Sequence, residues 1–140
     1  MLTALVFGYA DTAEAMARRG ASIRSLAEAA GLGRIEEARA RLDSASPGDR
    51  HRALAIAAQL GRSAIVEMLL DAGEDPNRFN PAGFHAHSTP LHQAALAGHV
   101  ETVRVLVERG ARIDIADKIW HGTPRGWARH SGRTEVEPYL

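Results

Sequence analysis

The stretch STPLHQAALAGHVETVRVLVERGA, residues 88–111, carries the clearest structural pattern of this chain. Thr89 is followed by Pro90, and this pair predicts the start of a helix. Threonine caps helix N-termini, and proline at the first helical position loses no hydrogen bond. We expect this helix to run to about Ala97, where Gly98 permits a tight turn.

A second helix is expected after that turn. Val100, Val103, Leu106 and Val107 recur at helical spacing and form one apolar stripe. Gly110 is expected to end the helix in a left-handed conformation, where a Cβ would cost about 1–2 kcal/mol. The stretch therefore predicts two short antiparallel helices. Such a pair cannot bury its apolar face alone, so similar pairs must stack on it.

The same pattern returns along the chain, which indicates an internal repeat. Turn glycines recur, and each has an alanine four positions before it: Ala4 and Gly8, Ala29 and Gly33, Ala57 and Gly61, Ala94 and Gly98, and Ala128 and Gly132. Small side chains at these positions are expected to let successive units pack closely. The chain therefore consists of repeats of one structural unit.

The segment TPLHQA, residues 89–94, resembles the ankyrin signature T-P-L-H-x-A at every fixed position. Residues 52–77 resemble an ankyrin unit well, and residues 24–42 resemble one more weakly. The resemblance implies an all-α fold, an ankyrin-repeat solenoid of stacked helix-turn-helix units with finger loops on one edge. We expect a single domain over residues 1–140, with full units at 24–49, 50–87 and 88–121 and partial units at 1–23 and 122–140.

The spacing of the turn glycines predicts where the fingers are long. Successive spacings are 25, 28, 37 and 34 residues, against an ankyrin period of about 33. Residues 43–51 are therefore expected to form a short connection without a finger. Developed fingers are expected at residues 74–88 and 111–122. The last helix contains Pro138 and is expected to be a short terminal cap.

The composition excludes several classes of partner and compartment. Lys plus Arg and Asp plus Glu are both 17, so the net charge is zero. Nucleic acid and anionic membranes would select a basic face, so neither is expected as a partner. The chain has no cysteine and no apolar run long enough to span a bilayer. We expect a cytoplasmic protein.

The long fingers and the inner helix face point to a site that binds a protein partner in the C-terminal half. Trp120 lies near the tip of the second finger, where it is either an interface anchor or part of the terminal cap. Trp127 occupies the repeat position of Glu28, Ile56 and Gln93, a row expected to face the concave side. The candidate partner-binding residues are Arg78, Phe84, His85, His87, Gln93, Lys118, Trp120 and Trp127.

Three alternatives remain open at this point. His92, the signature histidine, is expected to hydrogen-bond backbone and hold neighbouring loops together. A metal-binding protein or small metalloenzyme could instead use His85 and His87, with His92 or His121 completing the site. A self-associating scaffold is the third possibility, because an incompletely capped end would leave apolar surface exposed. No phosphate-binding loop, nucleophile elbow or zinc-protease motif occurs. We therefore expect no enzyme and no cofactor, and a monomer or weak homodimer.

Overall fold

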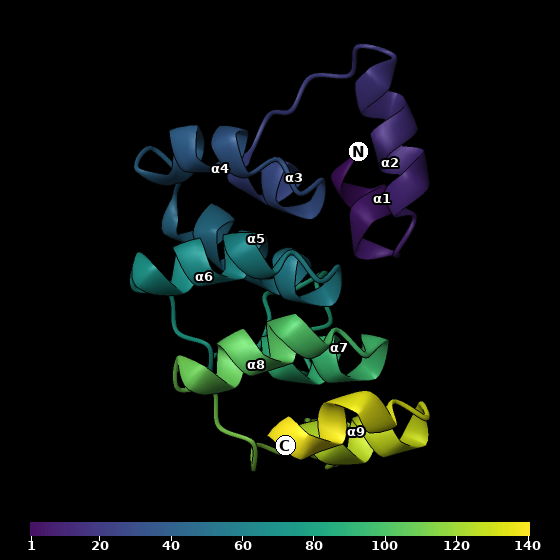
Figure 1. Ribbon diagram of the computed structural model, residues 1–140. Coiled ribbons are helices and arrows are strands. Elements are labelled where there is room, and N and C mark those ends of the chain that lie inside the picture. Colours follow the sequence, from purple (N-terminus) through teal and green to yellow (C-terminus); the bar gives the residue numbers. More distant parts are fainter.

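A computed structural model describes all residues from 1 to 140 and contains helices but no strand. Figure 1 shows helix pairs stacked along one direction, from the N-terminus at one end to the C-terminus at the other. The elements are α1 (Leu2–Val6), α2 (Ala10–Arg18), α3 (Leu26–Gly31), α4 (Ile35–Leu42), α5 (Pro47–Gln59), α6 (Ser63–Asp71), α7 (Pro90–Ala97), α8 (Val100–Glu108), α9 (Pro124–His130) and the 3₁₀ helix η1 (Thr134–Tyr139).

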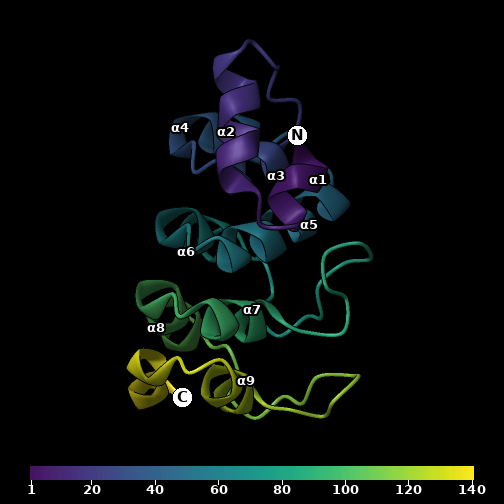
Figure 2. The same ribbon diagram turned by 90° about the vertical axis from the view of Figure 1, so that its right-hand side faces the viewer.

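The pairs form two layers (Figure 2). Helices α3, α5, α7 and α9 make the inner layer, α4, α6 and α8 make the outer layer, and two loops project beyond the inner layer. The first pair departs from this order, because α2 runs steeply across the direction of the other helices in both views. The expected solenoid with fingers on one edge is confirmed.

Alanine lets these layers approach closely, as the repeat predicts. Ala29, Ala57, Ala94 and Ala128 have no exposed surface, and Ala4 is partly buried. Leucines of the inner helices are buried beside them, among them Leu26, Leu54 and Leu91. At about 25 cal/mol per Å² of apolar area, this continuous core is the main source of stability. No single helix pair has an equivalent core of its own.

The predicted helix boundaries around residue 98 are confirmed. Helix α7 begins at Pro90, with Thr89 in the extended conformation at its N-cap. Gly98 and Gly110 both have left-handed backbones, with φ of 75° and 96°. These are values that a residue with a Cβ adopts only at a cost.

The connection predicted over residues 43–51 is shorter in the structure, because α5 already begins at Pro47. Ser46 caps that helix by accepting a hydrogen bond from the N–H of Asp49. The Asp49 carboxylate in turn accepts hydrogen bonds from the N–H groups of Leu26 and Ala27. The Asp49 side chain of α5 thus caps α3 and joins these two neighbouring units. It takes the place of a finger between them.

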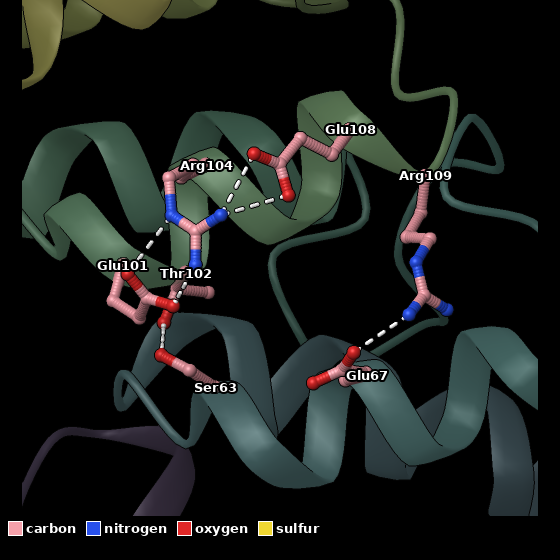
Figure 3. A network of polar contacts seen from close by, with 7 residues as sticks. All are labelled: Ser63, Glu67, Glu101, Thr102, Arg104, Glu108 and Arg109. Atoms are coloured by element: carbon pink, nitrogen blue, oxygen red, sulfur yellow. Dashed lines mark hydrogen bonds and ion pairs between the residues drawn. The ribbon is translucent and has the colours of Figure 1, made fainter.

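Polar contacts also join the outer helices α6 and α8 (Figure 3). The hydroxyl groups of Ser63 and Thr102 lie 2.7 Å apart, and Thr102 is fully buried. Arg109 reaches back to Glu67, at 2.6 Å, and to Asp71. These ion pairs are partly exposed, and such pairs contribute about 0–1 kcal/mol each. These ion pairs therefore add little to the free energy of unfolding. Their main effect is on how α6 and α8 align with each other.

The C-terminal end is closed by α9 and η1. Pro138 lies within η1, so the last helix is a short 3₁₀ segment, as the proline predicts. Val136 has no exposed surface and Leu140 is 8% exposed, so this end has an apolar cover. None of the helices combines the length and apolar content that a bilayer-spanning segment needs.

Candidate partner-binding site

The first finger (residues 74–88) and the second finger (residues 111–122) are hydrogen-bonded to each other at two places. The Lys118 N–H donates to the His87 carbonyl at 2.9 Å. Nearer the helices, the Asn77 side chain donates to the Gly110 carbonyl at 3.0 Å and accepts from the Arg112 N–H at 2.7 Å. The two fingers therefore form one unit that projects beyond the inner helices (Figure 2).

Asp117 holds the second finger in its conformation. This carboxylate is 1% exposed. One oxygen accepts from the N–H groups of Ile119 and Trp120, and the other accepts from the Gly122 N–H and the Trp127 indole N–H, all at 2.7–2.9 Å. Burial alone would raise the pKa of Asp117, but these hydrogen bonds outweigh burial and hold the pKa well below its usual range. Asp117 is therefore ionised at neutral pH.

His92 joins the start of α7 to the second finger, which confirms its predicted scaffold role. Its Nδ1 accepts from the Thr89 N–H at 3.2 Å and lies 2.8 Å from the Thr89 hydroxyl. Its Nε2 then carries the proton and donates to the Gly122 carbonyl at 3.0 Å. Burial lowers the pKa of His92, and the Gly122 carbonyl opposes this only in part.

A slot lies between the two fingers and the inner helices α7 and α9. Its volume is about 620 Å³. Aromatic rings make one wall: the centroids of His87 and Trp120 lie 5.4 Å apart, and those of Trp120 and Trp127 lie 5.9 Å apart, both edge to face. The slot is lined by His85, His87, Gln93, Leu96, Trp120, Gly122, Gly126, Trp127 and His130.

Five of the predicted partner-binding residues come together in this slot. They are His85, His87, Gln93, Trp120 and Trp127. Trp120 is 68% exposed, although its ring packs on its neighbours. Large apolar side chains with this exposure are typical of interaction surfaces.

The other three predicted residues lie elsewhere. Arg78 and Lys118 are exposed on the fingers but do not line the slot, and the Lys118 ammonium lies 4.3 Å from the centre of the Phe79 ring. The expectation for Phe84 needs correction, because this side chain is only 8% exposed and belongs to the hydrophobic core. The first finger folds back far enough to bury it. Phe84 therefore anchors the finger and offers no contact surface.

The row expected along the concave face is open only at its C-terminal end. Glu28 is 9% exposed and Ile56 is fully buried, so neither forms an open wall. Ile56 packs on α3, where a Cβ at Gly31 would lie 3.2 Å from it. Trp127 is partly exposed and lines the slot, whereas Gln93 is only 5% exposed at the slot and its amide donates to the Ser88 hydroxyl at 3.0 Å. Of the four residues in this row, only Trp127 on α9 has appreciable exposed surface.

Several residues of the slot were not predicted. Leu96 and His130 share one repeat position, two residues before the turn glycine, so the repeat alignment contained the signal for both. Asp117 was also missed, although an aspartate shortly before a glycine is a frequent turn signal. Its role depends on four donors that converge only in the folded finger.

The metal hypothesis does not fit this geometry. Both ring nitrogens of His92 are engaged in hydrogen bonds with protein groups. No set of three or more His, Asp or Glu side chains is arranged to hold a metal ion. His85 and His87 instead pack edge to face, with centroids 6.3 Å apart.

The fold defines a class of protein: a short helical solenoid of stacked helix pairs with finger loops on one edge. A family model described as ankyrin repeats, in three copies, matches residues 1–117. The chain belongs to the ankyrin-repeat family.

Among curated proteins, the chain is similar to human Cyclin-dependent kinase inhibitor 2A. The two are 35% identical over 119 residues, which cover 82% of this chain and 74% of that protein. Human Cyclin-dependent kinase 4 inhibitor B is 35% identical over 125 residues, covering 86% of this chain and 88% of that protein. These relatives support a protein-binding role without catalysis.

Proposed function

We propose that this chain is a non-enzymatic recognition module that binds a protein partner through the slot and the exposed tips of both fingers. The observation that carries the proposal is Trp120, an exposed tryptophan held in a fixed position. Its backbone N–H donates to Asp117, and its ring packs on His87 and Trp127. A pre-organised aromatic anchor loses little conformational entropy on binding, and tryptophan is enriched among residues that dominate binding energy.

The test is capture of a partner from the native cell by the purified chain. The double substitution Lys118→Glu and Trp120→Ala should abolish capture, because it reverses a finger charge and removes the anchor. Ile113→Ala is the matched control, since Ile113 is also an exposed apolar residue of the second finger but does not line the slot. Equal capture by the double variant and the control would refute the site.

A protein kinase is the first class of partner to test in a direct binding assay. Two human relatives are named as inhibitors of cyclin-dependent kinases. The same double variant then serves as the control in a direct binding assay with a purified kinase. Binding that survives both substitutions would place the contact outside the slot.

We further propose that the chain acts in the cytoplasm as a monomer or weak homodimer. At the C-terminal end η1 covers the stack and Val136 is buried, whereas at the N-terminal end Phe7 and Tyr9 are 68% and 64% exposed. Sedimentation should give the mass of a single chain, 15.1 kDa. A stable dimer would revive the self-association alternative.

A further inference from the structure

The slot has a chemical character that narrows the kind of partner it accepts. No aspartate or glutamate side chain lines it, and its ionisable residues are the three bases His85, His87 and His130. The rest of the lining is aromatic, aliphatic or glycine, apart from the Gln93 amide. A carboxylate on a partner would thus meet imidazoles and no carboxylate in the lining itself, while the ionised Asp117 lies behind the wall, bonded to Gly122 and Trp127.

The fingers around the slot carry mixed charge. The first finger has two acidic residues, Glu74 and Asp75, at its start and none between Arg78 and Ser88. In the second finger, the ionised Asp117 carboxylate accepts four internal hydrogen bonds, and Asp114 is paired with Arg112 at 3.0 Å. Two exposed cationic residues are close in sequence to residues that line the slot: Lys118 precedes Trp120 by two positions, and Arg125 directly precedes Gly126. With His neutral, the two fingers hold four acidic side chains and three cationic ones, so the bias toward basic groups is a property of the slot lining.

The slot is also built to take an apolar group. The Trp127 indole N–H is bonded to Asp117 at 2.9 Å, so this ring offers its carbon surface to the slot. Leu96, 37% exposed, adds an aliphatic side chain from α7. A volume of about 620 Å³ holds a large side chain together with part of its flanking backbone.

We infer that the slot binds a protein segment in which an aromatic side chain is flanked by carboxylates. This inference rests on the proposed function and specifies the chemistry of its partner. The aromatic ring packs against Trp120, Trp127 and Leu96. The flanking carboxylates meet the imidazoles of the wall and the cationic side chains of the finger and of α9.

The two tryptophans give a direct readout, because they are the only ones in the chain and both line the slot. Each gives one indole signal in a ¹⁵N-correlated NMR spectrum. The probe is the peptide acetyl-Asp-Glu-Phe-Glu-Asp-amide, compared with one carrying Ala at the centre and one with Lys-Arg flanks around Phe. The acidic Phe peptide should shift both indole signals saturably. Its affinity should exceed that of the Ala peptide about tenfold, the effect of burying one aromatic side chain.

Charge is tested by a matched pair of variants at Leu96. Leu96→Glu places a carboxylate in the slot, whereas Leu96→Gln has nearly the same shape and no charge. The acidic peptide should bind the Glu variant about fivefold more weakly than the Gln variant, and added salt should reduce that difference. Equal binding by the two variants would overturn the electrostatic part of the inference.

Other outcomes also decide the matter. Unmoved indole signals at about 5 mM peptide, a concentration that would largely saturate a site with a dissociation constant of about 1 mM, would overturn the inference. So would equal or tighter binding of the basic peptide or of the Ala peptide. If a cellular protein is nevertheless captured in a Trp120-dependent way, the proposed function stands and only the acidic-aromatic chemistry falls. Peptide binding without such capture would leave the slot chemistry intact and refute the proposed function.

Discussion

Substitution of Asp117 by asparagine tests the claim that this carboxylate fixes the second finger. Each carboxylate oxygen accepts two hydrogen bonds, from donors at 2.7–2.9 Å. Asparagine keeps one oxygen and places an NH₂ group where the other stood. Whichever way the amide turns, two N–H donors lose their acceptor and face another donor.

The expected cost follows from that count. A buried donor without an acceptor costs about 1–3 kcal/mol, and bonds to a charged acceptor lie in the upper part of the range for hydrogen bonds. The finger is partly open to water, so two lost bonds should lower the free energy of unfolding by about 3 kcal/mol. The unfolding entropy of a 140-residue chain is about 0.3 kcal/mol per kelvin. The melting temperature should therefore fall by about 10 °C.

Urea unfolding followed by far-UV circular dichroism measures the loss, and the near-UV spectrum reports on Trp120 and Trp127. Asp114→Asn is the matched control, because Asp114 belongs to the same finger but is exposed and paired only with Arg112. That control should stay within about 0.5 kcal/mol of the parent. A stability of Asp117→Asn as close to the parent as the control, with an unchanged near-UV spectrum, would refute the assigned role.

The free energy of unfolding at low pH tests whether the charge of Asp117 matters in addition to its shape. Its pKa is depressed in the folded state, so its contribution is complete above about pH 5 and is lost as the pH falls below the usual value near 3.8. The parent should therefore lose stability more steeply below about pH 4 than Asp117→Asn does. Parallel acid limbs would mean that the folded state does not favour the ionised carboxylate.

Two further predictions concern histidines and glycines. Burial lowers the pKa of His51, His92 and His99 below 6.5, so their protonation favours unfolding: the free energy of unfolding should fall as the pH drops from about 7 to about 5. Replacing His92 with glutamine should flatten that slope in urea titrations, and an unchanged slope would contradict it. A Cβ at Gly61 (φ +70°) would lie 2.7 Å from the His99 ring, whereas at Gly132 (φ +71°) it would meet nothing within 4 Å. Gly61→Ala should thus cost about 1 kcal/mol more than Gly132→Ala, for the displaced His99 hydrogen bond to the Gln59 carbonyl. Equal losses of stability for the two variants in thermal melting would show that the His99 ring moves aside without losing a stabilising contact.

Local sequence signals account for most of the fold. Thr89 and Pro90 mark the start of α7, and the same kind of pair, Ser46 and Pro47, marks the start of α5. The glycine spacing predicts a connection over residues 43–51, and this conflicts with the helix start that the second pair indicates. Gly98 ends α7 because its left-handed backbone is a property of that one residue. Signals of this kind need only a few neighbouring residues to be read.

The site is less accessible from sequence because its key contacts are long-range. The burial of Phe84 depends on how the first finger folds back onto the core. The function of Asp117 depends on a turn that brings the N–H of Gly122 and the indole of Trp127 to one oxygen. The repeat alignment could place Trp127 on the inner face, but it could not show that Ile56, at the same repeat position, is buried.

Hydrogen–deuterium exchange on the complex with the captured partner tests the central claim most directly. If recognition uses the slot and the finger tips, backbone protection should increase at residues 85–88 and 117–130, which contain most of the slot lining. The outer helices α4, α6 and α8 should exchange as they do in the free chain. Protection confined to those outer helices, with both fingers unchanged, would contradict the account.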